Sequence, residues 1–93
     1  MNKKDYLLEL KKKYENKLLD IEEEISKVTH ECELICTEVD IFDSLKHKGK
    51  YYQDSFSSLS LLEDNLNETL IKLKDEKSCI SYIIDFISNK MQG

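Results

Sequence analysis

Apolar residues recur at alternating steps of four and three along the first half of the chain. Nine of them keep this spacing without interruption: Tyr14, Leu18, Ile21, Ile25, Val28, Cys32, Ile35, Val39 and Phe42. This is the heptad pattern of a helix that packs lengthwise on a second helix. The pattern therefore predicts one long helix whose apolar stripe needs a partner of similar length.

The second half of the chain carries a matching stripe, in which the same frame meets a charge at Glu63 and at Lys77. Its apolar members are Tyr52, Phe56, Leu59, Leu66, Leu70, Leu73, Ile80, Ile84, Ile87 and Met91. Two such stripes cover each other when their helices lie antiparallel. We predict an all-α fold that forms a single domain over residues 1–93. It is a long antiparallel two-helix hairpin with a coiled-coil-like seam, in which helix 1 covers about 3–46 and helix 2 about 54–91.

Polar residues mark where these helices begin and end. Asn2, three residues before Asp5, is typical of a helix N-cap, so the first helix is predicted to begin near Lys3. Gly49 is the strongest stop signal inside a chain that has no proline, and the turn is predicted there. The start of the second helix is open among several serine and aspartate caps. A break over residues 75–78, which would give three helices, is an alternative.

Composition narrows the classes of partner. The chain has fourteen basic residues, all of them lysine, and nineteen acidic residues, which gives a net charge of -5. Duplex recognition depends on neutralising phosphates and reading guanine with arginine, so nucleic acid is not an expected partner. No run approaches the roughly 18 apolar residues of a membrane span, and we expect no membrane insertion. Residues 1–15 do not read as a signal peptide, so we expect a cytoplasmic location, with export alongside a partner as the alternative.

The residue types that carry chemistry are sparse. On a helix Cys32 and Cys36 share one side, whereas His30 lies about 160° round from Cys32. Two ligands do not make a structural zinc site, and these cysteines and Cys79 are predicted to be free thiols. The chain also has no glycine-rich phosphate loop and no paired carboxylates that a pocket would require. We therefore expect no enzyme, no catalytic residues, no metal and no cofactor.

Apolar residues outside the two stripes gather in two clusters, one near the turn and one near the termini. The residues predicted to bind a partner are Leu34, Ile41, Leu45, Tyr51, Leu61, Leu62, Tyr82, Ile83 and Phe86. The cluster near the termini also contains Tyr6, Leu8, Leu10 and Leu19. Surplus apolar faces indicate either an interface with a helical partner or the core of a three-helix or four-helix monomer. The prediction is an interface.

The centre of the chain carries a resemblance to a known family. His47, Lys48 and Gly49 lie between the predicted helices, and the aromatic residues Tyr52 and Phe56 follow. This arrangement resembles the WXG-type helical hairpins of type VII secretion in Gram-positive bacteria, which carry Trp-x-Gly at the turn. Histidine stands here where that family has tryptophan.

The export signal of that family is an aromatic residue with an acid four positions later. Tyr82 precedes Asp85 by only three positions, and Phe86 is followed by Lys90, so the signal is missing. The looser set of small targeting partners that bind LXG-domain toxins fits better. This resemblance implies a helical hairpin that lays apolar faces against the long helices of a toxin.

The expected function is thus a non-enzymatic interaction protein, a targeting factor or chaperone that binds a helical protein such as a type VII secreted toxin. Two alternatives remain open. One is an immunity protein or phage-type inhibitor, which the acidic run at Asp20, Glu22, Glu23 and Glu24 favours. The other is a homodimeric helical scaffold formed by self-association.

Overall fold

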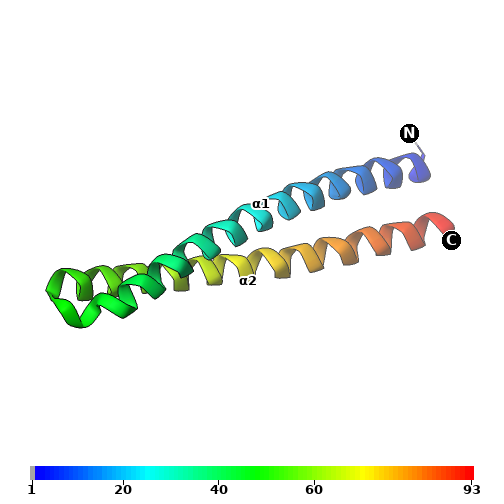
Figure 1. The fold of residues 1–93 in the computed structure, drawn as a ribbon. Coiled ribbons are helices and arrows are strands. Elements are labelled where there is room, and N and C mark those ends of the chain that lie inside the picture. Colours follow the sequence, from blue (N-terminus) through cyan, green and yellow to red (C-terminus); the bar gives the residue numbers. More distant parts are fainter. Residues whose placement is uncertain (1) are drawn as a thin grey trace. The chain divides into compact units, whose positions relative to one another are not determined.

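Two long helices joined by a short turn make up the protein. The computed structural model describes residues 2–93 (Figure 1). Helix α1 spans Lys3–Leu45, the 3-10 helix η1 spans Lys46–Lys48, and helix α2 spans Lys50–Gln92. No strand occurs within residues 2–93. The predicted all-α helical hairpin is confirmed.

Each helix contributes to two compact units. The terminal unit combines Met1–Ile25 with Leu73–Gly93, and the turn unit is Ser26–Lys72. In Figure 1 the turn unit is the hairpin coloured from cyan to yellow, and the terminal unit holds the blue and the orange to red segments. Within each unit a segment of α1 and a segment of α2 supply the apolar faces.

The heptad stripes are the faces that the helices bury. Every apolar residue of the two predicted stripes is buried or half-buried. Within residues 2–93 four hydrophobic side chains are buried. In the terminal unit these are Ile21 (8% exposed), Ile80 (6%) and Ile87 (4%), and in the turn unit it is Val28 (5%). Burial of these stripes is the main source of stability, because each fully buried aliphatic side chain contributes about 1.5 to 3 kcal/mol.

The start of α1 follows the sequence prediction. The side-chain Oδ1 of Asn2 accepts a hydrogen bond from the backbone N–H of Asp5 at 2.8 Å. The carbonyl of Asn2 accepts the N–H of Tyr6 at 3.1 Å. Asn2 is therefore the N-cap, and its amide satisfies a donor that the first turn of the helix leaves unpaired.

The turn lies where Gly49 predicted it, but α2 begins at Lys50, earlier than the expected residue 54. Gly49 has extended backbone angles (φ 162°, ψ 169°), and its carbonyl accepts the N–H of Gln53 at 3.2 Å. The rings of Tyr52 and Phe42 lie 6.4 Å apart between centroids. This contact favours a helical turn ahead of the serine-rich region, so the later N-cap candidates lie inside α2.

Residues 75–78 form no break, because α2 continues through them to Gln92. The polar stretch contains no glycine or proline that would interrupt a helix. Lys77, which occupies a stripe position, places its Nζ atom 3.9 Å from an Oε1 atom of Glu22 on α1. Its half-buried aliphatic stem thus continues the buried face while its charge finds a partner at the edge.

Candidate partner-binding site

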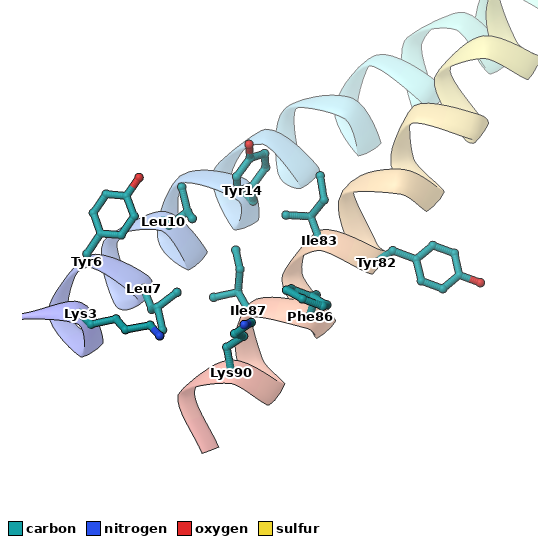
Figure 2. A pocket seen from close by; sticks show the side chains of 10 residues that line it. All are labelled: Lys3, Tyr6, Leu7, Leu10, Tyr14, Tyr82, Ile83, Phe86, Ile87 and Lys90. Atoms are coloured by element: carbon teal, nitrogen blue, oxygen red, sulfur yellow. The ribbon is translucent and has the colours of Figure 1, made fainter. Parts of the chain in front are cut away.

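An apolar groove of about 730 Å³ lies between α1 and α2 in the terminal unit. Ten residues line it: Lys3, Tyr6, Leu7, Leu10, Tyr14, Tyr82, Ile83, Phe86, Ile87 and Lys90. Figure 2 shows Leu7, Leu10 and Tyr14 on α1 opposite Ile83 and Ile87 on α2. The groove is large enough to take several side chains from another molecule.

Two neighbouring residues of α2 contribute to different parts of the groove, one to its buried floor and the other to its exposed rim. Ile87 is 4% exposed and forms part of the buried stripe, whereas Phe86 beside it is 64% exposed. Tyr6, Tyr82 and Ile83 are also exposed. Large apolar side chains that stay in contact with water around one groove are typical of a surface that another molecule covers.

The charged groups at this groove are all cations. Lys3 and Lys90 line it, and no carboxylate does. The Nζ atom of Lys90 lies 5.5 Å from the centroid of the Phe86 ring. Lys13 and Lys17 place their Nζ atoms 5.7 and 5.3 Å from the centroid of the Tyr14 ring. Lysines at these distances interact favourably with aromatic rings, which keeps their charge beside the apolar surface.

The turn unit carries the other predicted partner-binding residues, and five of the six are exposed: Leu34, Ile41, Tyr51, Leu61 and Leu62. Leu45 is half-buried. Tyr51 lines a shallower groove of about 460 Å³ together with Phe42 and Leu59. The exposed residues of this unit therefore make a more dispersed apolar surface than the groove of the terminal unit.

The structure brings Tyr82, Ile83 and Phe86 together, as predicted, but on a surface to which α1 contributes equally. The predicted site omitted the α1 side of this groove, which consists of Lys3, Tyr6, Leu7, Leu10 and Tyr14. Tyr6 and Leu10 were recognisable in the sequence as surplus apolar residues near the termini. Tyr14 belongs to the predicted buried stripe, and Leu7 lies one heptad before it in the same frame. Their periodicity alone does not show that they also border an open groove.

The sequence-defined turn residues do not contribute to either groove. His47 and Lys48 lie in η1, and they and Gly49 are exposed. Lys46 links this turn to both helices of the turn unit, since its Nζ atom lies 2.7 Å from Asp43 and 4.5 Å from the centroid of the Phe56 ring. The turn therefore has contacts that fix its geometry.

Two cysteines, Cys32 and Cys36, line a groove of about 480 Å³ in the turn unit, beside Glu63 and Asn67. The thiol of Cys32 donates a hydrogen bond to Oδ1 of Asn67 at 3.8 Å. The carboxylate of Asp40, then desolvation and then the hydrogen-bonded Glu63 raise the pKa of the Cys36 thiol above its ordinary value of 9.0. Cys36 therefore remains a protonated thiol at neutral pH, which is the less nucleophilic form.

Within residues 2–93 no three histidine, cysteine, aspartate or glutamate side chains come together in a way that could hold a metal ion. In that part of the chain neither helix has a stretch apolar and long enough to cross a bilayer. All three cysteines are free thiols.

The fold and the groove define the protein as a two-helix hairpin with an apolar groove in its terminal unit. Comparisons with protein families, with curated proteins and with solved structures found no match to this chain.

Proposed function

We propose that this chain is a non-enzymatic interaction protein that binds a helical partner protein. The single observation that carries this proposal is the groove of the terminal unit, where Tyr6, Tyr82 and Phe86 remain more than half exposed around a buried floor. A third helix packed on this pair would cover these side chains in the same way that each helix covers the other.

The finer role is a targeting factor or chaperone for an exported toxin. Support for it comes from the hairpin itself and from the position of His47, Lys48 and Gly49 at the turn, where WXG-type hairpins carry their motif. In this role the chain binds the long helices of a toxin in the cytoplasm and keeps their apolar faces out of water until export.

Coexpression with the protein encoded by the neighbouring gene, followed by size-exclusion chromatography, tests this role. The two chains are expected to elute as one complex. Changing Phe86 to Asp is expected to abolish the complex while the far-UV circular dichroism of the hairpin stays unchanged, because Phe86 is 64% exposed. Ser78→Asp, which adds the same charge at an exposed position outside the groove, serves as control. A hairpin that elutes alone in every case would contradict the role as a targeting factor.

A second candidate function is an immunity protein or other inhibitor. The turn unit favours it, because residues 26–72 hold nine carboxylates against five lysines, a net charge of -4. Such a surface would suit a basic active site on a target enzyme. Inhibition of that enzyme that survives Phe86→Asp and is lost on Ile41→Asp would favour this candidate over the first.

A further inference from the structure

A second stripe on α1 lies beside the one that packs on α2. It consists of Lys3, Tyr6, Leu10, Lys13 and Lys17, which follow each other at steps of three and four. Three of these residues, Lys3, Tyr6 and Leu10, line the groove directly. Lys13 and Lys17 lie against the ring of Tyr14, which also lines it. Along α1 the groove thus begins at Lys3, continues over apolar residues to Tyr14, and is flanked there by Lys13 and Lys17.

Helix α2 repeats this arrangement at one end of the groove. Ile83 and Phe86 supply apolar surface, and Lys90 follows one turn later. Figure 2 shows Lys90 and Lys3 at the same end of the groove, with Ile83 and Phe86 further along it. Lys3 and Lys90 therefore line one end of the groove, and Lys13 and Lys17 flank the other end, beside the ring of Tyr14.

We propose that this groove binds an amphipathic helix of another protein, whose central apolar residues are flanked at both ends by aspartate or glutamate. This inference rests on the proposed function and specifies its partner. Residues 3 to 17 of α1 span roughly 21 Å, at about 1.5 Å per residue. The docked helix therefore has about fourteen residues, or four turns, with carboxylates in its first and last turns.

Local charge supports an acidic partner although the chain as a whole is acidic. Residues 2–17 and 82–93 together hold seven lysines and four carboxylates, whereas residues 18–81 hold seven lysines and fifteen carboxylates. The positive charge is thus concentrated in the segments that form the groove. Complementary charge at the rim of an apolar interface selects the partner and its orientation.

The same charges argue against a second copy of this chain in the groove. Two copies related by a two-fold axis would place identical grooves face to face. The lysine pairs of one copy would then meet those of the other, and like charges across an interface are unfavourable. A helix with carboxylates at its ends removes this repulsion and pairs with each lysine pair.

Three synthetic peptides of fourteen residues test the inference against the full chain. All three carry the same leucine stripe, and the residues flanking it are glutamate in one, glutamine in the second and lysine in the third. Binding is measured by fluorescence anisotropy. The glutamate peptide is expected to bind about tenfold more tightly than the glutamine peptide at low salt, because several exposed ion pairs each contribute weakly. The difference is expected to disappear at about 0.5 M NaCl, where surface charges are screened.

Two double variants test whether the preference for the glutamate peptide depends on the lysines at the groove or only on the net charge of the chain. Lys13→Gln with Lys17→Gln is expected to reduce the preference for the glutamate peptide from about tenfold to about threefold, because Lys3 and Lys90 remain. Lys4→Gln with Lys12→Gln changes the net charge equally at positions off the stripe, and the preference is expected to persist. Equal affinity for the glutamine and glutamate peptides would overturn the charge assignment while leaving a helical partner in place. Equal effects of the two double variants would also overturn it.

Two further measurements test the two other possible ligands of the groove, a second copy of this chain and a membrane surface. Sedimentation of the chain alone tests self-association, and an association that Phe86→Ser removes would assign the groove to a second copy. Flotation with vesicles of phosphatidylcholine and phosphatidylglycerol in equal parts tests a membrane surface. Binding to these vesicles that depends on Phe86, without binding to any peptide, would overturn the inference. Failure of all three peptides would overturn it as well, whereas the proposed function is tested separately by coelution with the neighbouring gene product.

Discussion

At the scale of single residues, the first turn of α1 depends on one side chain. Asn2 accepts the N–H of Asp5 at 2.8 Å and is the last residue before the helix. This turn also presents Lys3 to the groove of the terminal unit. The cap therefore supports one end of the proposed site as well as the helix.

Asn2→Ala is expected to open this first turn. Loss of an asparagine cap costs about 1 kcal/mol, so amide hydrogen exchange at Asp5 and Tyr6 should accelerate by about fivefold. Hydrogen exchange followed by NMR measures this directly. Asn16→Ala, which removes the same amide from an exposed position inside α1, should leave these rates unchanged. Equal acceleration in both variants would mean that the effect is not one of capping.

A second residue-scale effect concerns the Cys36 thiol. The carboxylate of Asp40 is the largest cause of its raised pKa, and a raised pKa means less thiolate at a given pH. Asp40→Asn is therefore expected to lower the pKa of Cys36 and to accelerate its alkylation by iodoacetamide at about pH 8. Peptide mapping by mass spectrometry follows the reaction at this cysteine.

Glu38→Gln is the matched control for that measurement. It removes a carboxylate from the same helical turn that is not among the causes of the shift. Alkylation of Cys36 should keep its original rate in this variant. An unchanged rate in Asp40→Asn would show that the local carboxylate does not control the thiol.

At the scale of elements, the sequence determined the two helices more completely than their ends. The heptad stripes, the Asn2 cap and the turn at Gly49 all agree with the structure, because each depends on local spacing or on a single residue. The start of α2 did not follow from local signals. It depends on the packing of Tyr52 on Phe42, a contact between helices that propensities at Ser55 or Ser57 do not report.

The partner-binding residues predicted for the terminal unit, Tyr82, Ile83 and Phe86, lie only on the α2 side of the groove for a related reason. Periodicity separates apolar residues into a buried stripe and a surplus, but it does not show which surplus residues of two helices meet. Tyr6 and Phe86 are far apart in the sequence and line one groove in the structure. The predicted hairpin places both residues near the termini, but only the structure shows that they line the same groove.

The charged interruptions of the α2 stripe limit how well the helices pack. Lys77 occupies a stripe position and pairs with Glu22 at 3.9 Å, but both side chains are 45% exposed. An ion pair this exposed contributes at most about 1 kcal/mol. A leucine at this position would instead bury apolar surface in the same frame.

Lys77→Leu is accordingly expected to stabilise the hairpin by about 1 kcal/mol after the loss of the ion pair. For a chain of this size that gain raises the melting temperature by roughly 4 to 8 °C. Thermal unfolding followed by circular dichroism measures it. Lys74→Leu, at an exposed position one turn away, should give no comparable gain. A lower melting temperature for Lys77→Leu would show that the ion pair matters more than the apolar stripe.

At the scale of the whole molecule, stability depends on few side chains. Within residues 2–93 the buried hydrophobic residues are Ile21, Val28, Ile80 and Ile87. Typical domains are stable by about 5 to 15 kcal/mol, and a core this small places the free chain at or below the lower end of that range. Covering the exposed groove would add apolar burial that the hairpin alone does not have.

Ile87→Ala and Phe86→Ala test this division between core and binding surface. Ile87 is 4% exposed, so its truncation is expected to cost about 2 to 5 kcal/mol and to leave much of the free chain unfolded. Phe86 is 64% exposed, so its truncation should cost less than about 1 kcal/mol. Urea unfolding followed by circular dichroism compares the two. A similar loss in both variants would mean that the groove belongs to the core of the free chain.

The placement of the groove also decides how this protein can be labelled for such experiments. Lys3 and Lys90, which line the groove, lie within three residues of the two ends of the 93-residue chain. An affinity tag or fluorescent fusion attached close to Lys3 or Lys90 would therefore lie beside the groove and compete with its ligand. The exposed turn from Lys46 to Gly49 belongs to the other unit and does not line the groove, so it tolerates a label better. Because Cys32, Cys36 and Cys79 are free thiols, a dye attached through Lys48→Cys requires that these three cysteines first be replaced by serine.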